Sequence, residues 1–139
     1  MQIAGLQNLS LVDFPGYLSS VVFTKGCNFK CGYCHNPDLI SKSSPYAITE
    51  EEVFSFLTHR RNMIEGVVVS GGEPSLETDL KEFFIKLREK GFKTKLDTNG
   101  SNPDILEELL REKLLDYVAI DIKTSFEKYP LVTDIIDIK

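Results

Sequence analysis

Residues 18–34 read LSSVVFTKGCNFKCGYC and join an apolar, β-branched run to a loop that holds three cysteines. The run Leu18–Phe23 predicts a β-strand, so the cysteine loop is expected at the carboxyl end of that strand. Cys27, Cys31 and Cys34 are the only cysteines in the chain. Their odd number and close spacing do not suit a disulfide framework, and a reducing compartment would leave the thiols available to bind metal.

Strands and amphipathic helices alternate through the rest of the chain. A capping-box pattern at Thr49–Glu52 predicts a helix whose apolar positions run to Ile64, and a second apolar stripe predicts a helix from Leu80 that ends before Gly91. Asn102 and Pro103 are expected to cap and open a third helix. Further strands are predicted at residues 67–69, 92–96 and 117–120. This alternation predicts an α/β fold of about four βα units around a parallel sheet.

Polar residues follow each predicted strand. The cysteine loop follows the first strand, and the segments after the other three are 70–74 (SGGEP), 97–98 (DT) and 121–123 (DIK). Since the carboxyl ends of parallel strands lie at one edge of a sheet, these segments are expected to converge. Each of them taken alone is also typical of an ordinary turn or a solvated loop end.

Composition limits the classes of partner. The formal net charge is −5, with 21 acidic and 16 basic residues, and the basic residues do not cluster as they do in nucleic-acid-binding proteins. No apolar run approaches the roughly 20 residues of a membrane span, and the amino-terminal residues do not resemble a signal peptide. We therefore expect a cytoplasmic protein without a nucleic acid or membrane partner.

The cysteine spacing favours an iron–sulfur cluster over other metals. Three thiolates would ligate three irons of a [4Fe–4S] cube and leave the fourth iron open to a chelating small molecule. A zinc site completed by His35 is the alternative, but adjacent Cys34 and His35 would strain to reach one ion. The C-x3-C-x2-C pattern, with Tyr33 before the last cysteine, resembles the signature of the radical S-adenosylmethionine (SAM) superfamily.

That resemblance implies a [4Fe–4S] cluster and SAM as cofactors, with Cys27, Cys31 and Cys34 as the metal ligands. It also implies that Tyr33 lies near the adenine and that the Gly-Gly-Glu-Pro segment binds the SAM amino group. The residues it assigns to SAM binding are Tyr33, His35, Gly71, Gly72, Glu73, Asp97, Thr98, Asp121, Lys123 and Thr124. Two aspartates would repel the SAM carboxylate, so Lys123 or a bound monovalent cation is expected to compensate.

Three further segments narrow the resemblance. Residues 10–16 (SLVDFPG), 23–28 (FTKGCN) and 34–37 (CHNP) resemble the activating enzymes of glycyl radical enzymes, such as the activase of anaerobic ribonucleoside-triphosphate reductase. The fold implied is a partial TIM-like (βα) barrel with more βα units than the four present here. We therefore expect residues 1–139 to form a single domain, the amino-terminal part of a truncated barrel.

The function implied is reductive cleavage of SAM to a 5′-deoxyadenosyl radical, which takes hydrogen from a glycine of a glycyl radical enzyme. The implied partners are that enzyme and an electron donor such as flavodoxin or ferredoxin. Two alternatives remain open on the sequence. One is a radical SAM enzyme acting on a small molecule, as the carboxy-deazaguanine synthases do, and the other is a non-enzymatic metal-binding module.

Overall fold

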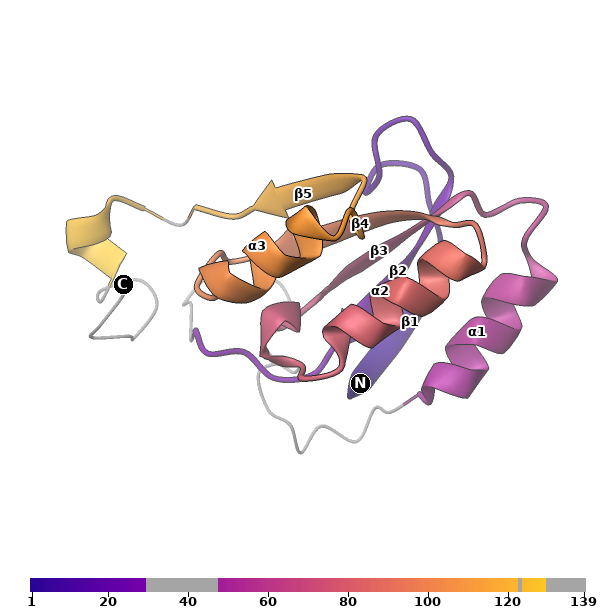
Figure 1. Cartoon of the computed structure of the whole chain (residues 1–139), viewed down its shortest axis with the longest axis horizontal. Coiled ribbons are helices and arrows are strands. Elements are labelled where there is room, and N and C mark those ends of the chain that lie inside the picture. The colour runs from indigo at the N-terminus through magenta and orange to yellow at the C-terminus, as the bar shows by residue number, and fades with distance from the viewer. Residues whose placement is uncertain (30–47, 123, 130–139) are drawn as a thin grey trace.

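The computed structural model describes residues 1–29, 48–122 and 124–129. Within these ranges, five strands form one sheet in the order β1-β2-β3-β4-β5. Strands β2 to β5 run parallel, whereas β1 lies at the edge and is antiparallel to β2 (Figure 1). The strands are β1 (Ile3–Ser10), β2 (Ser19–Thr24), β3 (Gly66–Gly71), β4 (Lys93–Thr98) and β5 (Tyr117–Ile120).

The four predicted strands correspond to β2 through β5, and the α/β fold with a parallel sheet is confirmed. The sequence did not predict the antiparallel strand β1, so the sheet is mostly rather than wholly parallel. Gly5, Gln7 and Asn8 interrupt the apolar alternation of β1, and residues 7–9 are exposed. An edge strand with one exposed stretch lacks the continuous apolar pattern on which strand prediction depends.

Helix α1 (Glu50–His59) begins at the predicted capping box. The Thr49 hydroxyl accepts a hydrogen bond from the Glu52 N–H at 3.1 Å, and the Glu52 carboxylate accepts one from the Thr49 N–H at 2.8 Å. The helix ends at His59, five residues before the predicted apolar position Ile64. Ile64 lies in the loop to β3 and is buried, so its spacing reflects packing against the core rather than helical structure.

Helices α2 (Leu80–Glu89) and α3 (Pro103–Arg111) lie between successive strands. Gly91 follows α2 with a φ of +82°, as predicted for a residue just past a helix end. Pro103 opens α3, and Asn102 is at its N-cap, but the Asn102 amide donates to the carbonyl of Ser75 at 3.1 Å instead of capping the helix. Two short 3-10 turns are η2 (Pro74–Leu76) and η3 (Phe126–Lys128). None of the helices in the described ranges is long and apolar enough to span a membrane.

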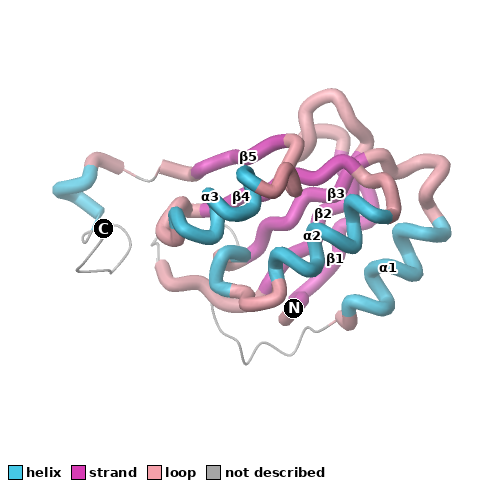
Figure 2. Tube along the Cα trace, in the orientation of Figure 1, coloured by secondary structure: helices cyan, strands magenta, loops and turns pink. Residues whose placement is uncertain are grey.

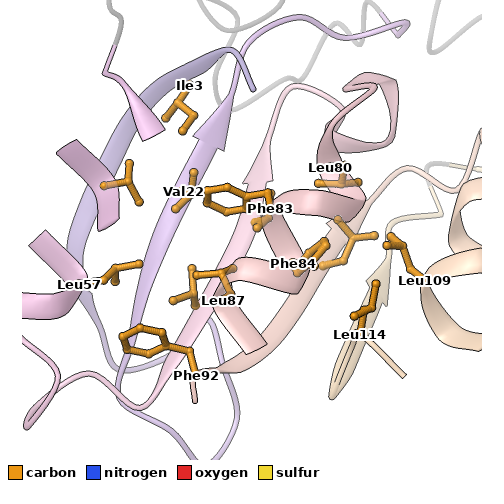
Figure 3. Close-up of a cluster of buried hydrophobic side chains, with 14 of the residues drawn as sticks. Ile3, Val22, Leu57, Leu80, Phe83, Phe84, Leu87, Phe92, Leu109 and Leu114 are labelled. Carbon is orange, nitrogen blue, oxygen red and sulfur yellow. The ribbon is translucent and has the colours of Figure 1, made fainter. Parts of the chain in front are cut away.

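The three α-helices cover one face of the sheet (Figure 2). Right-handed crossovers between parallel strands taken in sequential order place every helix on the same side. The main core lies between these layers (Figure 3). Its fully buried members include Val22, Val67, Val69, Leu96, Leu57, Leu80, Phe83, Phe84, Leu87 and Leu109.

The opposite face of the sheet carries a second, smaller cluster of Phe14, Val21 and Val68. Phe14 packs on Gly66 at the start of β3, where a Cβ atom would come within 2.7 Å of the Phe14 ring. The turn that presents Phe14 closes with a hydrogen bond from the Tyr17 N–H to the Phe14 carbonyl at 3.1 Å. Phe14 therefore covers this face near the amino-terminal ends of the strands. We call it the inner face, since it is the side away from the helices.

Candidate functional site: the carboxyl ends of the strands

The first component of the site is the loop that follows β2. Gly26 has a φ of +82°, a conformation that favours glycine, and turns the chain into Cys27. The Cys27 side chain is half-buried, and its Sγ accepts a hydrogen bond from the Phe29 N–H at 3.3 Å. Phe29 is itself buried, with its ring edge-on to that of Tyr129. The other predicted residues of this loop, Tyr33, His35 and the ligands Cys31 and Cys34, lie outside the described residues.

The second component is the Gly71-Gly72 turn after β3, which packs directly on the Cys27 loop. The Gly72 N–H donates to the Thr24 carbonyl at 3.2 Å, and the Glu73 N–H donates to the Gly26 carbonyl at 2.8 Å. A Cβ atom at Gly71 would lie 2.3 Å from the Thr24 nitrogen, and one at Gly72 would lie 2.0 Å from the Gly26 oxygen. Both glycines are thus needed for close approach between two backbone segments of this chain.

Glu73 occupies a buried position between β3 and β4, and only 1% of its surface is exposed. Four donors surround its carboxylate: Ser75 N–H at 3.2 Å, Ser75 hydroxyl at 2.6 Å, Thr98 hydroxyl at 2.5 Å and Asn99 N–H at 2.7 Å. A buried carboxylate is tolerated when several hydrogen bonds replace its hydration. Glu73 therefore fastens the turn after β3 to the end of β4.

Asp97 lies on the inner face near the end of β4. Its carboxylate forms an ion pair with Lys95 at 2.9 Å, and Lys95, which is only 7% exposed, also donates to the Asp13 carbonyl and lies over the Tyr117 ring. Burial raises the pKa of Asp97, and this effect exceeds the opposing influence of Lys95. A partly buried carboxylate with a raised pKa at a strand end is a feature that functional sites share with structural ion-pair networks.

Thr98 and Asp97 point to opposite faces of β4, because successive side chains of a strand alternate. Thr98 is buried on the helix side and donates to Glu73. Asp121 is exposed after β5, and its N–H donates to the Thr98 carbonyl at 2.9 Å. Thr124 is half-buried farther along, and Lys123 lies outside the described residues. The described parts of the strand-end segments therefore lie at one edge of the sheet, with the Thr98 side chain turned toward Glu73.

Several residues that organise this edge were not predicted. Asn28, Asn99 and Ser101 join the Cys27 loop to the loop after β4 through side-chain hydrogen bonds. Lys95 joins Asp97 to the segment around Asp13. Polar residues beside a glycine, as at Asn99-Gly100, predict only a turn, so no sequence pattern indicated the contacts across the sheet edge.

The described part of this edge fits an iron–sulfur ligand and a small polar cofactor beside it. The Cys27 thiol is half-buried and receives a backbone N–H, as thiolates that ligate iron–sulfur clusters do. The glycine turn brings the end of β3 against Cys27, and Asp97 lies on the inner face one strand farther on. Within the described ranges, no three His, Cys, Asp or Glu side chains are grouped closely enough to hold a metal. The predicted ligands Cys31 and Cys34 lie outside these ranges.

Comparisons with known proteins agree with this geometry. The profile of the radical SAM superfamily matches residues 21–138. A Methanocaldococcus jannaschii protein provisionally named a glycyl-radical enzyme activating enzyme is 43% identical over 128 residues, which are 91% of this chain and 52% of that protein. Pyruvate formate-lyase-activating enzymes of Clostridium pasteurianum and Staphylococcus aureus are 35% and 36% identical, over 88% and 85% of this chain and 52% and 51% of their own length. The chain thus spans about half the length of the curated relatives it matches.

Two solved structures share the fold. QueE from Escherichia coli superposes with a TM-score of 0.59 at 20% identity, covering 72% of this chain and 52% of that one. A structure of anSMEcpe with bound AdoMet, which is SAM, also gives 0.59, at 26% identity over 78% of this chain and 32% of that one. With a family match over most of the chain, a cysteine at the end of β2 and a glycine turn packed on it, this protein belongs to the radical SAM superfamily, whose cofactors are a [4Fe–4S] cluster and SAM.

Proposed function

We propose that this chain is the cofactor-binding part of a radical SAM enzyme that activates a glycyl radical enzyme. The observation that carries the proposal is the 43% identity to a glycyl-radical enzyme activating enzyme over 91% of the chain, supported by 35% identity to an activating enzyme of pyruvate formate-lyase. Residues 1–139 form one domain in this proposal. The activity belongs to the whole protein, since this chain matches only about half of those relatives.

Cys27, Cys31 and Cys34 would hold the [4Fe–4S] cluster, and SAM would chelate the iron that the thiolates leave open. When bound, the cluster supplies the electron that cleaves SAM to methionine and a 5′-deoxyadenosyl radical. Three free thiolates suit a reducing compartment, so the location in this proposal is the cytoplasm.

The chain's own residues would bind and orient SAM. In the proposal, the backbone of Gly71 and Gly72 lies beside the SAM methionine. Glu73 fixes the turn through its four hydrogen bonds, and the SAM amino group would donate to its Oε2, which only the Asn99 N–H of those four donors occupies. The further contacts proposed are Tyr33, His35, Asp97, Thr98, Asp121, Lys123 and Thr124. A monovalent cation beside Asp97 and Asp121 would offset the charge of the SAM carboxylate.

Asp97 is the described residue best placed for this work. Lys95 holds the carboxylate from the inner face at 2.9 Å, which limits its rotamers before SAM arrives. Burial raises the pKa of Asp97 by more than Lys95 lowers it, which disfavours the ionised carboxylate. A cation or a hydroxyl donor from a ligand would stabilise the ionised form.

The partner in this proposal is a glycyl radical enzyme, and a flavodoxin or a ferredoxin would supply the electron. The test is anaerobic incubation of the whole protein with reductant, SAM and candidate glycyl radical enzymes encoded in the same genome, followed by electron paramagnetic resonance. A glycyl radical doublet is expected only when the partner is present. The Cys27→Ala variant should give no doublet, because two thiolates do not retain the cluster.

Two results would contradict the proposal. A SAM-dependent product formed from a small molecule, with no radical on any partner protein, would identify a small-molecule enzyme. Purification under anaerobic conditions with one zinc and no sulfide per chain would identify a metal-binding module. About four irons and four sulfides per chain, with a cluster spectrum that SAM perturbs, are the expected values.

A further inference from the structure

Asn28 immediately follows Cys27, and both the nitrogen and the oxygen of its side-chain amide form hydrogen bonds. Its Nδ2 donates to the Ser101 hydroxyl at 2.8 Å, and its Oδ1 accepts from the Asn99 Nδ2 at 3.0 Å. The Asn99 Oδ1 in turn accepts from the Ser101 N–H at 3.0 Å. Asn28, Asn99 and Ser101 thus form a small closed network, which we call the asparagine clamp, between the cysteine loop and the loop after β4.

The clamp is continuous with the buried carboxylate of Glu73. The Asn99 N–H donates to the Glu73 Oε2 at 2.7 Å, and the Glu73 N–H donates to the Gly26 carbonyl at 2.8 Å. A circuit of hydrogen bonds therefore runs from Gly26 through Glu73 and Asn99 to Asn28. Gly26 and Asn28, on either side of Cys27, are thus both held by hydrogen bonds to Glu73 and Asn99.

These hydrogen bonds lie next to the peptide group that donates to the sulfur of Cys27. The Phe29 N–H that donates to Sγ at 3.3 Å belongs to the peptide group joining Asn28 to Phe29. The ring of Phe29 is buried against Tyr129, which holds one side of that peptide, and the clamp holds the other. The peptide that carries this N–H therefore lies between two side chains that are both held by contacts.

We propose that Asn28 is a positioning residue for the cluster: it aims the Phe29 N–H at the Cys27 thiolate and so raises the reduction potential of the iron–sulfur centre. The inference rests on the proposed function for the existence of the cluster. Hydrogen bonds to cluster sulfurs stabilise the reduced, more negative state, which raises the potential. A side-chain amide suits the position, because its nitrogen donates to Ser101 while its oxygen accepts from Asn99.

The test compares Asn28→Ala with Asn62→Ala, a matched control at an exposed asparagine in the turn after α1. Two quantities are measured: the midpoint potential of the reconstituted cluster, by redox titration, and the exchange rate of the Phe29 amide hydrogen in protein with and without cluster. Asn28→Ala should retain iron, shift the potential to more negative values and speed Phe29 exchange. Asn62→Ala should leave both quantities unchanged. An unchanged potential and unchanged exchange in Asn28→Ala would overturn the proposal.

A second set of variants separates the clamp from a general loss of stability. Ser101→Ala removes one of the two bonds to Asn28 and should give a smaller shift of the same sign, whereas Ser101→Thr keeps a hydroxyl and should restore the wild-type potential. In the double variant Asn28→Ala/Ser101→Ala, the shift should not exceed that of Asn28→Ala alone, because both changes break one network. Additive shifts would contradict the clamp.

Failure of the clamp and failure of the proposed function give different results. The potential and the Phe29 exchange rate are measured without any partner enzyme, so absence of a glycyl radical does not affect them. If Asn28→Ala does not retain iron, Phe29 exchange in the cluster-free Asn28→Ala and Ser101→Ala proteins decides the question. Exchange at the wild-type rate in both would refute a positioning role, and faster exchange in both supports it.

Discussion

Glu73 shows how one side chain can organise an edge of a sheet. Its carboxylate is the N-cap of η2 through the Ser75 N–H, and it also binds the hydroxyl of Thr98 and the N–H of Asn99. The sequence predicts that the segment Gly-Gly-Glu-Pro binds SAM, and that role stays a prediction; the structure shows that this turn joins β3, β4 and the Cys27 loop. Gly71 and Gly72 contribute to this joint because their missing Cβ atoms let the two loops touch.

The contact at Gly72 yields a direct prediction. Gly72→Ala would place a methyl group 2.0 Å from the Gly26 oxygen, where both neighbours are backbone and neither can rotate away. The variant should lower the free energy of unfolding by about 1–3 kcal/mol, the usual effect of overpacking, and should weaken cluster retention because the Cys27 loop must move. Urea denaturation and iron analysis measure the two effects.

Gly5→Ala is the control for Gly72→Ala, because a Cβ atom at Gly5 meets nothing within 4 Å. Since Gly5 lies in β1, replacing it should be neutral or should stabilise by about 0.5–1 kcal/mol through reduced flexibility of the unfolded chain. Equal destabilisation in both variants would mean that the close approach at Gly72 is not what constrains this position.

Asp97 and Asp116 are expected to change the stability of the fold in opposite directions as the pH rises. Burial raises the pKa of Asp97, so its contribution to stability is present below its ordinary value of 3.8 and is lost as the pH rises through its folded-state pKa. Burial also acts to raise the pKa of Asp116, but the Thr94 N–H and the Arg88 guanidinium outweigh it and hold that pKa below the ordinary 3.8. The contribution of Asp116 is therefore present above 3.8 and is lost as the pH falls through its folded-state pKa.

Urea titrations of Asp97→Asn and Asp116→Asn between about pH 2.5 and 7 test these signs. With rising pH, the wild type should lose stability relative to Asp97→Asn and gain stability relative to Asp116→Asn. The comparison uses differences between proteins at each pH, so other titrating groups cancel. If the wild type instead gained stability relative to Asp97→Asn as the pH rises, Lys95 would lower the pKa of Asp97 by more than burial raises it.

At the scale of elements, the helices and parallel strands were predictable because each is apolar on the face it buries. The antiparallel strand β1 was not, since Gly5, Gln7 and Asn8 break its alternation. Helix α1 ended earlier than predicted because Ile64 reaches the core from a loop. The sequence also did not predict the face on which Thr98 lies, because a one-residue change in the register of strand pairing turns every side chain to the other face.

Helix α3 offers a test of packing at adjacent positions. Leu109 is fully buried in the main core, whereas its neighbour Leu110 is 49% exposed. Leu109→Ala should cost about 2–5 kcal/mol in the free energy of unfolding, since it leaves a cavity against the sheet. Leu110→Ala should change it by no more than about 0.5 kcal/mol, as surface substitutions usually do. Urea denaturation measures both, and similar losses in the two variants would place α3 in a different rotation about its axis.

At the scale of the whole molecule, the sequence predicted that the strand ends would converge, because topology alone brings the carboxyl ends of parallel strands together. It did not predict how they are joined. The bonds from Glu73 to the end of β4 and from Asn28 to Asn99 link residues 26 and 71 positions apart in the chain. Such pairs carry no local sequence pattern, since either partner alone is typical of a turn.

These long-range bonds predict that loading the cluster stabilises more than its own loop. A ligand that binds only the folded state raises the thermal midpoint, and the Cys27 loop is bonded to the turn after β3 and to the loop after β4. Anaerobic reconstitution should therefore raise the midpoint and slow amide exchange at Glu73 and Asn99 as well as around Cys27. Chelation of iron should reverse both changes.

The Cys27→Ser variant is the control for cluster loading. It should unfold at the same temperature as the cluster-free wild type, because a half-buried thiol replaced by a hydroxyl leaves the core intact, and it should gain nothing on reconstitution. Slower exchange confined to the cysteine loop would contradict the prediction, since it would mean that the bonds at Gly26 and Asn28 do not transmit the constraint. Slower exchange at Glu73 and Asn99 only when the cluster is present would show that the three strand ends respond as one unit.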